Sequence, residues 1–175
     1  HFKALPHMYM PQHAVSIWMD MTHDVVMNPY TIEENFLSDS DIALFKHELR
    51  DCVFVEGSAV VKYRFDHSQR VASQLDYYKA VKYPPGNGLW ETPGVIRRNT
   101  TSISKVNNLW WEMMCRYSSR DQISLPYILD KHSIKPHVLP GFAGKCSPTN
   151  NKIIRHVQHH NCLLYTSDAA DESVC

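Results

Sequence analysis

The stretch NGLWETPGVIRR, from Asn87 to Arg98, joins a loop rich in turn-forming residues to a short apolar run. The loop presents Trp90 and Glu91, and the apolar run ends in two arginines. A strand fixes the ends of such a loop while the loop offers polar groups to solvent, so units of this kind often line binding sites. The stretch therefore predicts a core strand with a candidate site beside it. The alternative is an ordinary loop before a core strand.

The composition is that of a single globular domain. The chain has 175 residues, of which 43% are hydrophobic and 21% charged, enough for a sizeable core. Lys+Arg and Asp+Glu number 18 each, and this balance argues against nucleic acid or an anionic membrane as the main partner. We see no apolar run of membrane-spanning length and no signal peptide. The chain starts at His1, so we expect an N-terminally truncated fragment, cytoplasmic if the source is bacterial.

The cysteines and histidines give no clear metal site. The five cysteines lack CxxC or paired spacing, which favours reduced, mostly buried thiols over disulfides or zinc ligands. Three histidines cluster near the end of the chain and could bind a metal, although scattered surface histidines are the commoner outcome. The residues concerned are Cys52, Cys115, Cys146, Cys162 and Cys175, and His156, His159 and His160.

The last residues look foreign to the rest of the chain. The segment CLLYTSDAADE, residues 162–172, reads like a translated sequencing adapter. We therefore expect the natural domain to cover residues 1–161 and residues 162–175 to be a non-native tail. The alternative is a genuine polar tail, and either interpretation removes the segment from fold and function.

The order of apolar patterns predicts an α/β domain. Residues 14–19 and 42–45 are expected to be buried strands, and residues 131–161 an irregular loop. Residues 52–63 fit neither pattern clearly. Four helices are expected. The first runs from a capping box at Thr31 and Glu34 to about Leu37, and the second runs from Ser68 to about Tyr83. The third begins at Ser102 or Ser104, and the fourth, which Ser118 or Ser119 caps, runs from Arg120 to about Asp130.

Asp20 is the first candidate for chemistry. It directly follows the predicted strand that contains Trp18, and the carboxyl ends of strands are where open α/β sheets place ligands. Carboxylates suit Mn²⁺ or Mg²⁺, but the usual second acid of such a pair is replaced by Thr22. His23 is a possible substitute ligand. A capped turn is the alternative interpretation.

Two further groups of polar residues could line the same cleft. Arg120, Asp121 and Gln122 fall in the first turn of a predicted helix, whose free N–H groups favour anions. There Arg120 could neutralise a phosphate, while Asp121 acts as a base and Gln122 recognises hydroxyls. The other group is His47, Arg50 and Glu56. The alternative for Asp121 is simply a favourable charge at the helix N-terminus. The alternative for His47, Arg50 and Glu56 is a solvated turn.

Several common catalytic motifs are absent. The sequence contains no nucleophile elbow, P-loop, G-x-G-x-x-G or H-E-x-x-H motif. These absences argue against serine hydrolases, nucleoside triphosphatases, dinucleotide oxidoreductases and zinc proteases.

The order and spacing of the motifs, from Leu5 to about Leu129, resemble a known family. This is the glycosyltransferase-like family that includes the plant turgor-regulation-defect alkaline ceramidase and a plant mucilage-related protein, with many bacterial members. The motifs are LPH, SIWMD, ALFKHELRDCVFVE, NGLWET, GVIRRN, LWWEM and SSRDQISLPYI.

The resemblance implies a nucleotide-diphospho-sugar transferase fold of the GT-A kind, with a mixed sheet flanked by helices. The family usually follows the aspartate with glycine and an amide or lysine, whereas this chain has Met21 and Thr22. Family motifs map onto Trp18, Asp20, His47, Arg50, Glu56, Asn87, Gly88, Glu91, Arg120, Asp121 and Gln122.

The predicted activity is transfer of a sugar from a nucleotide-sugar donor to a glycan or other hydroxyl acceptor. Asp121 and Glu91 are expected to be catalytic, and Asp20 to touch a divalent cation (Mn²⁺ or Mg²⁺) or the donor ribose. The residues expected to bind substrate are Trp90, Asn87, His47, Arg50, Glu56, Arg98, Arg120 and Gln122, with Arg97 a further candidate for the diphosphate. The alternatives are a ceramidase-like amide hydrolase and a non-catalytic carbohydrate-binding module.

Overall fold

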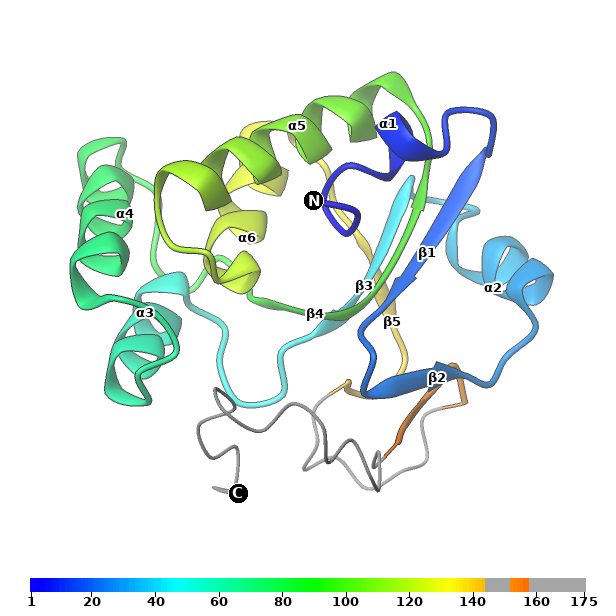
Figure 1. The fold of residues 1–175 in the computed structure, drawn as a ribbon, viewed down its shortest axis with the longest axis horizontal. Helices are drawn as coiled ribbons and strands as arrows, with labels where there is room; N and C mark the ends of the chain where they lie inside the picture. Colours follow the sequence, from blue (N-terminus) through cyan, green and yellow to red (C-terminus); the bar gives the residue numbers. More distant parts are fainter. Residues whose placement is uncertain (144–151, 158–175) are drawn as a thin grey trace, which may run out of the picture.

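The computed structural model describes residues 1–143 and 152–157, and it has the predicted α/β architecture, a mixed sheet flanked by helices (Figure 1). Strands and helices alternate through the first half of the chain, and the second half is mainly helical. The helices are α1 (Pro6–Tyr9), α2 (Pro29–Phe36), α3 (Val53–Lys62), α4 (Ser68–Ala80), α5 (Thr101–Arg116) and α6 (Asp121–Lys131). The strands are β1 (Val15–Met19), β2 (His23–Val25), β3 (Ile42–Lys46), β4 (Trp90–Arg98), β5 (His137–Leu139) and β6 (Ile154–His156).

Strand β4 is central to the main sheet. The strand order is β1-β4-β3-β5, with β4 antiparallel to both neighbours and β5 parallel to β3. The pairing of β1 with β4 is regular, whereas the pairing of β3 with β4 shifts register between Leu44 and Phe45. Strands β2 and β6 form a separate antiparallel pair.

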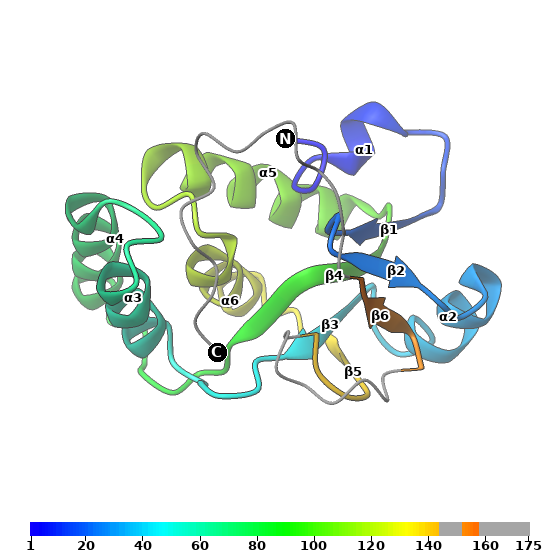
Figure 2. The ribbon, with the colours of Figure 1, turned by 60° about the horizontal axis from the view of Figure 1, so that its bottom comes forward.

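The sheet separates two apolar cores. Successive side chains of a strand point to opposite faces, so Leu44 and Val95 lie in the first core, and Phe45 and Ile96 lie in the second. Helices α3 to α6 gather on the side of the first core, whereas α2 lies on the other side (Figures 1 and 2). The N-terminal segment with α1 lies beside α5 on the first side (Figure 2).

Strands β1, β3 and β4 confirm the three strand predictions, whereas the prediction of an irregular loop at residues 131–161 was wrong in part. The stretch at residues 52–63, which fitted neither pattern, contains helix α3 despite Gly57. A Cβ at Gly57 would lie 2.8 Å from Leu75 Cδ1, so the missing side chain lets α4 pack closely. Residues 131–161 are not wholly irregular, because β5 and β6 pair with β3 and β2.

The helix starts also differ from the predicted caps. Helix α2 begins at Pro29 and is capped by Asn28, whose side-chain oxygen accepts from Tyr30 N at 2.9 Å. Proline suits this first helical position because its missing N–H would have no helical partner there. Thr100 caps α5, and Arg120 occupies the N-cap position of α6 without a capping hydrogen bond.

Some of the sequence predictions concern residues outside the described part of the chain. The tail at residues 162–175, the side chains of the histidine cluster, and Cys146, Cys162 and Cys175 lie outside the described residues. Cys52 and Cys115 are free thiols. Within residues 1–143 and 152–157, no helix combines the length and apolar character needed to cross a membrane.

We expect Asn28→Ala to lower the free energy of unfolding by about 1 kcal/mol, because Tyr30 N–H loses its capping acceptor. Thr31→Ala is the matched control and should have almost no effect, since Thr31 is exposed and does not cap the helix. Urea denaturation of both variants measures the difference. A larger loss for Thr31→Ala would contradict the assignment of Asn28 as the cap.

Candidate functional site

Asp20 and Asp121 meet at one ammonium group, that of Lys3. Asp20 follows β1, and its N–H donates to Pro93 O at 2.8 Å, so it extends the pairing with β4 by one residue. Its Oδ1 accepts from Trp18 Nε1 at 2.6 Å and from Lys3 Nζ at 3.2 Å. Asp121, the first residue of α6, places Oδ2 at 2.6 Å from the same Nζ. Three distant segments therefore converge at this point.

These three charged groups are partly shielded from solvent. The side chains of Lys3 and Asp121 are each 18% exposed, and that of Asp20 is 38% exposed. Shielding strengthens the attraction between opposite charges, because fewer water dipoles screen it. No motif in the sequence indicated a role for Lys3.

An aromatic hollow borders the meeting point. It has a volume of about 400 Å³ and is lined mainly by apolar side chains of the N-terminal segment and β1. Trp18 links the two features, because its ring lines the hollow and its Nε1 donates to Asp20. Its lining includes Phe2, Tyr9, Trp18 and Arg97.

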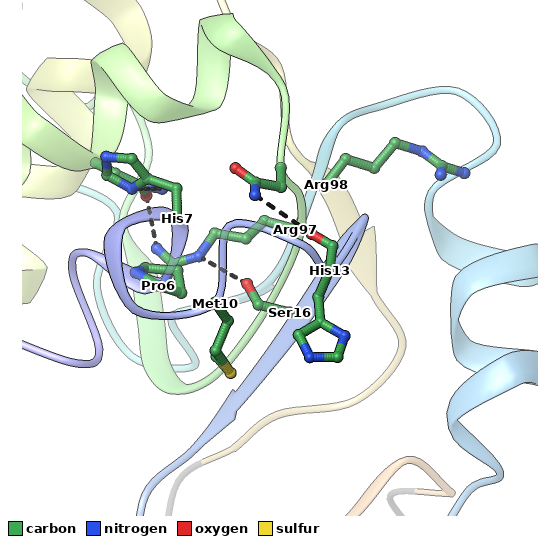
Figure 3. A pocket seen from close by; sticks show the side chains of 9 residues that line it. Pro6, His7, Met10, His13, Ser16, Arg97 and Arg98 are labelled. Atoms are coloured by element: carbon green, nitrogen blue, oxygen red, sulfur yellow. Dashed lines mark hydrogen bonds between the residues drawn. The ribbon is translucent and has the colours of Figure 1, made fainter.

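Arg97 is a buried cation with neutral partners. It is 1% exposed, and Nη1 donates to Asn107 Oδ1 at 2.8 Å and Nη2 to Lys3 O. Its Nε donates to Ser16 Oγ at 3.5 Å (Figure 3). Its guanidinium also lies 5.7 Å from the centre of the Trp110 ring. Burial lowers the pKa of Arg97 to about 9. Within the part of the chain that the structure describes, no carboxylate forms an ion pair with Arg97.

Arg98 points away from this site. Figure 3 shows its side chain directed away from Arg97, toward the side of α2. Its Nη1 lies 2.8 Å from Glu33 Oε1, and Nη2 donates to Leu37 O. Because adjacent strand residues face opposite ways, β4 assigns one arginine to each face. The structure does not bring Arg98 together with Asp20 and Asp121.

Glu91 also lies apart from the two aspartates. It pairs with Phe45, and its carboxylate accepts from Ala143 N at 2.6 Å and from Glu48 N at 3.5 Å. Phe45 and Ala143 belong to the second core, on the face opposite to Trp18 and α6. Glu91 is 5% exposed. The expectation that Glu91 and Asp121 share a cleft is therefore not met, and Glu91 has the contacts of a residue that anchors residues 48 and 143.

His47, Arg50 and Glu56 do come together, as their spacing suggested. Glu56 Oε2 lies 2.5 Å from Arg50 Nε and 3.8 Å from His47 Nε2. Burial lowers the pKa of His47, Glu56 acts in the opposite direction, and Arg50 lowers the pKa further. Glu56 is 3% exposed, and its carboxylate balances the charge of Arg50 inside the protein.

The remaining loop candidates, Asn87 and Trp90, are separated from each other. Asn87 donates to Asp130 Oδ1 at 3.0 Å and to Tyr83 OH at 3.3 Å, near the end of α6. Trp90 is half-buried and packs against the first core. It is Trp18 that borders the aromatic hollow.

Arg120 and Gln122 flank Asp121 at the start of α6. The Arg120 guanidinium lies 5.1 Å from the centre of the Phe65 ring, and Arg120 Nε is buried with no hydrogen-bond partner in the structure. Gln122 is half-buried in the first turn.

The loop before α6 is fixed by Asp66. Asp66 Oδ2 accepts from Ser119 N at 2.7 Å and from the hydroxyls of Ser118 and Ser119 at 2.8 and 3.0 Å. Burial by itself raises the pKa of Asp66, but these hydrogen bonds and one from His67 N outweigh it, so the pKa is lowered from 3.8. Asp66 therefore helps to position Asp121, although no motif in the sequence indicated it.

The donor atoms around Asp20 do not fit a divalent cation. Its Oδ1 is already bonded to Trp18 and Lys3. His23 is directed elsewhere, with Nε2 at 2.8 Å from Ala143 O. Across residues 1–143 and 152–157, no group of three or more His, Cys, Asp or Glu side chains is placed to hold a metal ion. We therefore assign no step of the chemistry to such an ion.

Comparison with known proteins gives the family. A family described as "TOD1/MUCI70, glycosyltransferase-like domain" matches residues 2–159. The chain belongs to this family. It is 27% identical over 165 residues to the probable hexosyltransferase MUCI70 of Arabidopsis thaliana, a match that covers 88% of this chain and 28% of that relative. The chain thus spans little more than a quarter of that TOD1/MUCI70 protein. No solved structure matches it.

We expect Asp66→Ala to lower the free energy of unfolding at pH 7 by about 1–2 kcal/mol, because four donors lose a charged acceptor. The pKa of Asp66 is lower in the folded state, so its contribution is present above the unfolded value of 3.8 and is lost as the pH falls through the folded value. Urea denaturation at pH 7 and at successively lower pH should show the difference between variant and wild type shrinking.

Asp76→Ala is the matched control for that measurement. Asp76 is 70% exposed, and within the described part of the chain its carboxylate pairs with Lys79 alone, so its loss should cost a few tenths of a kcal/mol. Equal effects of the two substitutions, or a difference that does not depend on pH, would contradict the role given to Asp66.

Proposed function

We propose that this protein is a glycosyltransferase that moves a sugar from a nucleotide-sugar donor to a hydroxyl acceptor. Family membership supports the class of reaction. The observation that carries the location is the convergence of Asp20 and Asp121 beside an aromatic hollow. The α/β sheet with helices on both faces is compatible with a GT-A type fold, which we include in the proposal.

Asp121 is proposed as the base that accepts the proton of the attacking hydroxyl. The reaction needs a carboxylate within hydrogen-bond distance of that hydroxyl. Asp121 is partly exposed at the start of a helix, where the N–H groups favour a negative charge, and Lys3 offsets that charge without enclosing it. Gln122, in the same turn, is placed to bind a second hydroxyl.

Trp18 and Asp20 are proposed to bind the sugar. Aromatic rings offer an apolar face to the C–H groups of a sugar ring, while a carboxylate accepts hydrogen bonds from its hydroxyls. Trp18, Phe2 and Tyr9 supply rings to the hollow, and the Asp20 carboxylate lies directly at the Trp18 indole. These contacts support Trp18, in preference to Trp90, as the tryptophan that contacts the sugar in this proposal.

Arg97 is proposed to balance the charge of the donor diphosphate. Among the described residues the acceptors of this buried guanidinium are neutral, and a nearby phosphate would stabilise its positive charge. Arg97 also lines the aromatic hollow, so the anionic and sugar parts of one donor could bind next to each other.

Titration with a panel of nucleotide sugars, followed by a transfer assay, tests the proposed function. We expect at least one donor to bind and to be consumed in the presence of a hydroxyl acceptor, and Asp121→Asn to reduce transfer by about a hundred-fold or more while binding changes little. Glycan binding without donor binding would indicate a carbohydrate-binding module instead. Turnover of ceramide without donor binding would indicate the amide hydrolase.

Glu91→Gln should lower stability and leave transfer activity nearly unchanged, whereas Asp121→Asn should lower transfer activity. The amide weakens the bonds to Ala143 N and Glu48 N, so we expect a loss of about 1 kcal/mol in the free energy of unfolding with transfer nearly unchanged. Thermal unfolding and the transfer assay, run on both variants, separate the two roles. If Glu91→Gln abolished transfer in a stably folded protein, Glu91 would belong to the catalytic site after all.

Arg97→Gln and Arg98→Gln form a second matched pair. Removing the charge of Arg97 should weaken binding of a nucleoside diphosphate about ten-fold or more, because the anion loses its buried partner. Arg98→Gln removes the contacts of Arg98 with Glu33 and Leu37 O on the other face and should leave that binding unchanged. Calorimetric titration with nucleoside diphosphate decides between them, and Arg97→Lys retains the charge if Arg97→Gln does not fold.

A further inference from the structure

We infer that the ammonium of Lys3 supplies, between Asp20 and Asp121, the positive charge that a divalent cation supplies in metal-dependent nucleotide-sugar enzymes. The site then works without such an ion. This inference rests on the proposed function for the location of the site. Its central measurement, however, does not require transfer activity.

The position of the Lys3 nitrogen is the first reason. Nζ lies 2.6 Å from Asp121 Oδ2 and 3.2 Å from Asp20 Oδ1, so both carboxylates contact one cationic atom. A metal bridging the same two oxygens would have to lie at about the same place, since Mg²⁺ binds carboxylate oxygens at about 2.1 Å. Ammonium and metal cannot share that place, because both are positive and the space between the carboxylates holds one of them.

The lysine is also held firmly. Lys3 O accepts from Arg97 Nη2, and the next two residues, Ala4 and Leu5, are buried in the first core with exposed fractions of 0% and 6%. The backbone at Lys3 is therefore fixed through its carbonyl group and through the two residues that follow it. A fixed backbone reduces the entropy lost when the ammonium is held between the carboxylates.

Among residues 1–143 and 152–157, the side chains near Asp20 in the sequence give a metal no further ligands. Divalent cations such as Mg²⁺ and Mn²⁺ favour several oxygen ligands. Beyond Asp20, His23 faces Ala143 O at 2.8 Å and Asp24 lies 3.4 Å from Arg155 Nη2. Trp18 Nε1 is a donor aimed at Asp20 Oδ1, which suits an anion and not a metal. The surroundings match a carboxylate pair bridged by a lysine.

Substitution of Lys3 by methionine tests the inference. Lys3→Met keeps most of the apolar stem and removes the charge, leaving two carboxylates with no common cation. We expect wild type to show no Mn²⁺ site that depends on Asp20, and Lys3→Met to bind Mn²⁺ at least about ten-fold more tightly than wild type. Adding Asp20→Asn to Lys3→Met should abolish the gain. Electron paramagnetic resonance of free Mn²⁺ gives the binding curves, and circular dichroism verifies the fold.

Two controls keep the measurement decisive. Lys79→Met removes an equally charged lysine that pairs with a single exposed carboxylate, Asp76, and should create no Mn²⁺ site. Lys3→Arg keeps the charge and should bind no more Mn²⁺ than wild type, which remains informative if Lys3→Met does not fold. Stoichiometric Mn²⁺ binding by wild type that is lost in Asp20→Asn would overturn the inference. Tighter Mn²⁺ binding by Lys3→Arg than by wild type would also overturn it. A folded Lys3→Met that binds Mn²⁺ no more tightly than wild type would do the same.

The transfer assay distinguishes failure of this inference from failure of the proposed function. With a donor that is consumed, wild-type transfer should persist in EDTA. Complete loss of transfer in EDTA, restored by Mn²⁺, would overturn the role of Lys3 and leave the proposed function intact. If no nucleotide sugar binds at all, the proposed function fails, while the Mn²⁺ curves of the Lys3 variants still decide which cation lies between the carboxylates.

Discussion

The register of β4 between its two neighbours is the constraint on which the rest of the structure depends. Backbone hydrogen bonds to β1 and β3 fix which of its side chains face each core. A shift by one residue would exchange Val95 with Ile96, and Arg97 with Arg98. Arg97 would then lose its acceptors near Asn107, and Arg98 would lose Glu33. The apolar contacts and the polar contacts of the sheet therefore favour the same pairing.

The N-terminal segment supplies the third part of the candidate site, Lys3. It crosses one face of the sheet, where Lys3 O binds Arg97 and Lys3 Nζ binds Asp20 and Asp121. Residues from the start of the chain, from the end of β1 and from the start of α6 thus meet within a few hydrogen bonds. Asp66 holds the loop that leads into α6 and so supports the last of these three groups. The site depends on long-range contacts, although each of its parts has a simple local structure.

Local patterns in the sequence predicted the elements better than their relations in space. The apolar runs of β1 and β3 were sufficient to place those strands, and the polar residues after Ser118 correctly placed Asp121 in the first turn of a helix. The convergence on Lys3 was beyond prediction because it depends on how the first residues cross the sheet. Hydrophobic periodicity contains no information about that path.

The orientation of Glu91 was also difficult to predict from the sequence. On a regular strand it would share a face with Val95, four residues later, because alternate residues point the same way. The register shift between Leu44 and Phe45 pairs Glu91 with Phe45 and turns it toward the second core. β-Bulges change the direction of side chains in this way, and a single sequence gives little warning of them.

The division of the apolar interior by the sheet has a consequence for how this protein can change. The second core, behind the sheet, includes Phe36, Ile96 and Ile154, none of which lies beside Asp20 or Asp121. Substitutions there can alter thermal tolerance while reaching the opposite face through the shared backbone of β1, β3 and β4. Most residues around the aromatic hollow belong to the other face, so ligand preference and robustness of the fold are largely open to separate selection, in nature or in the laboratory.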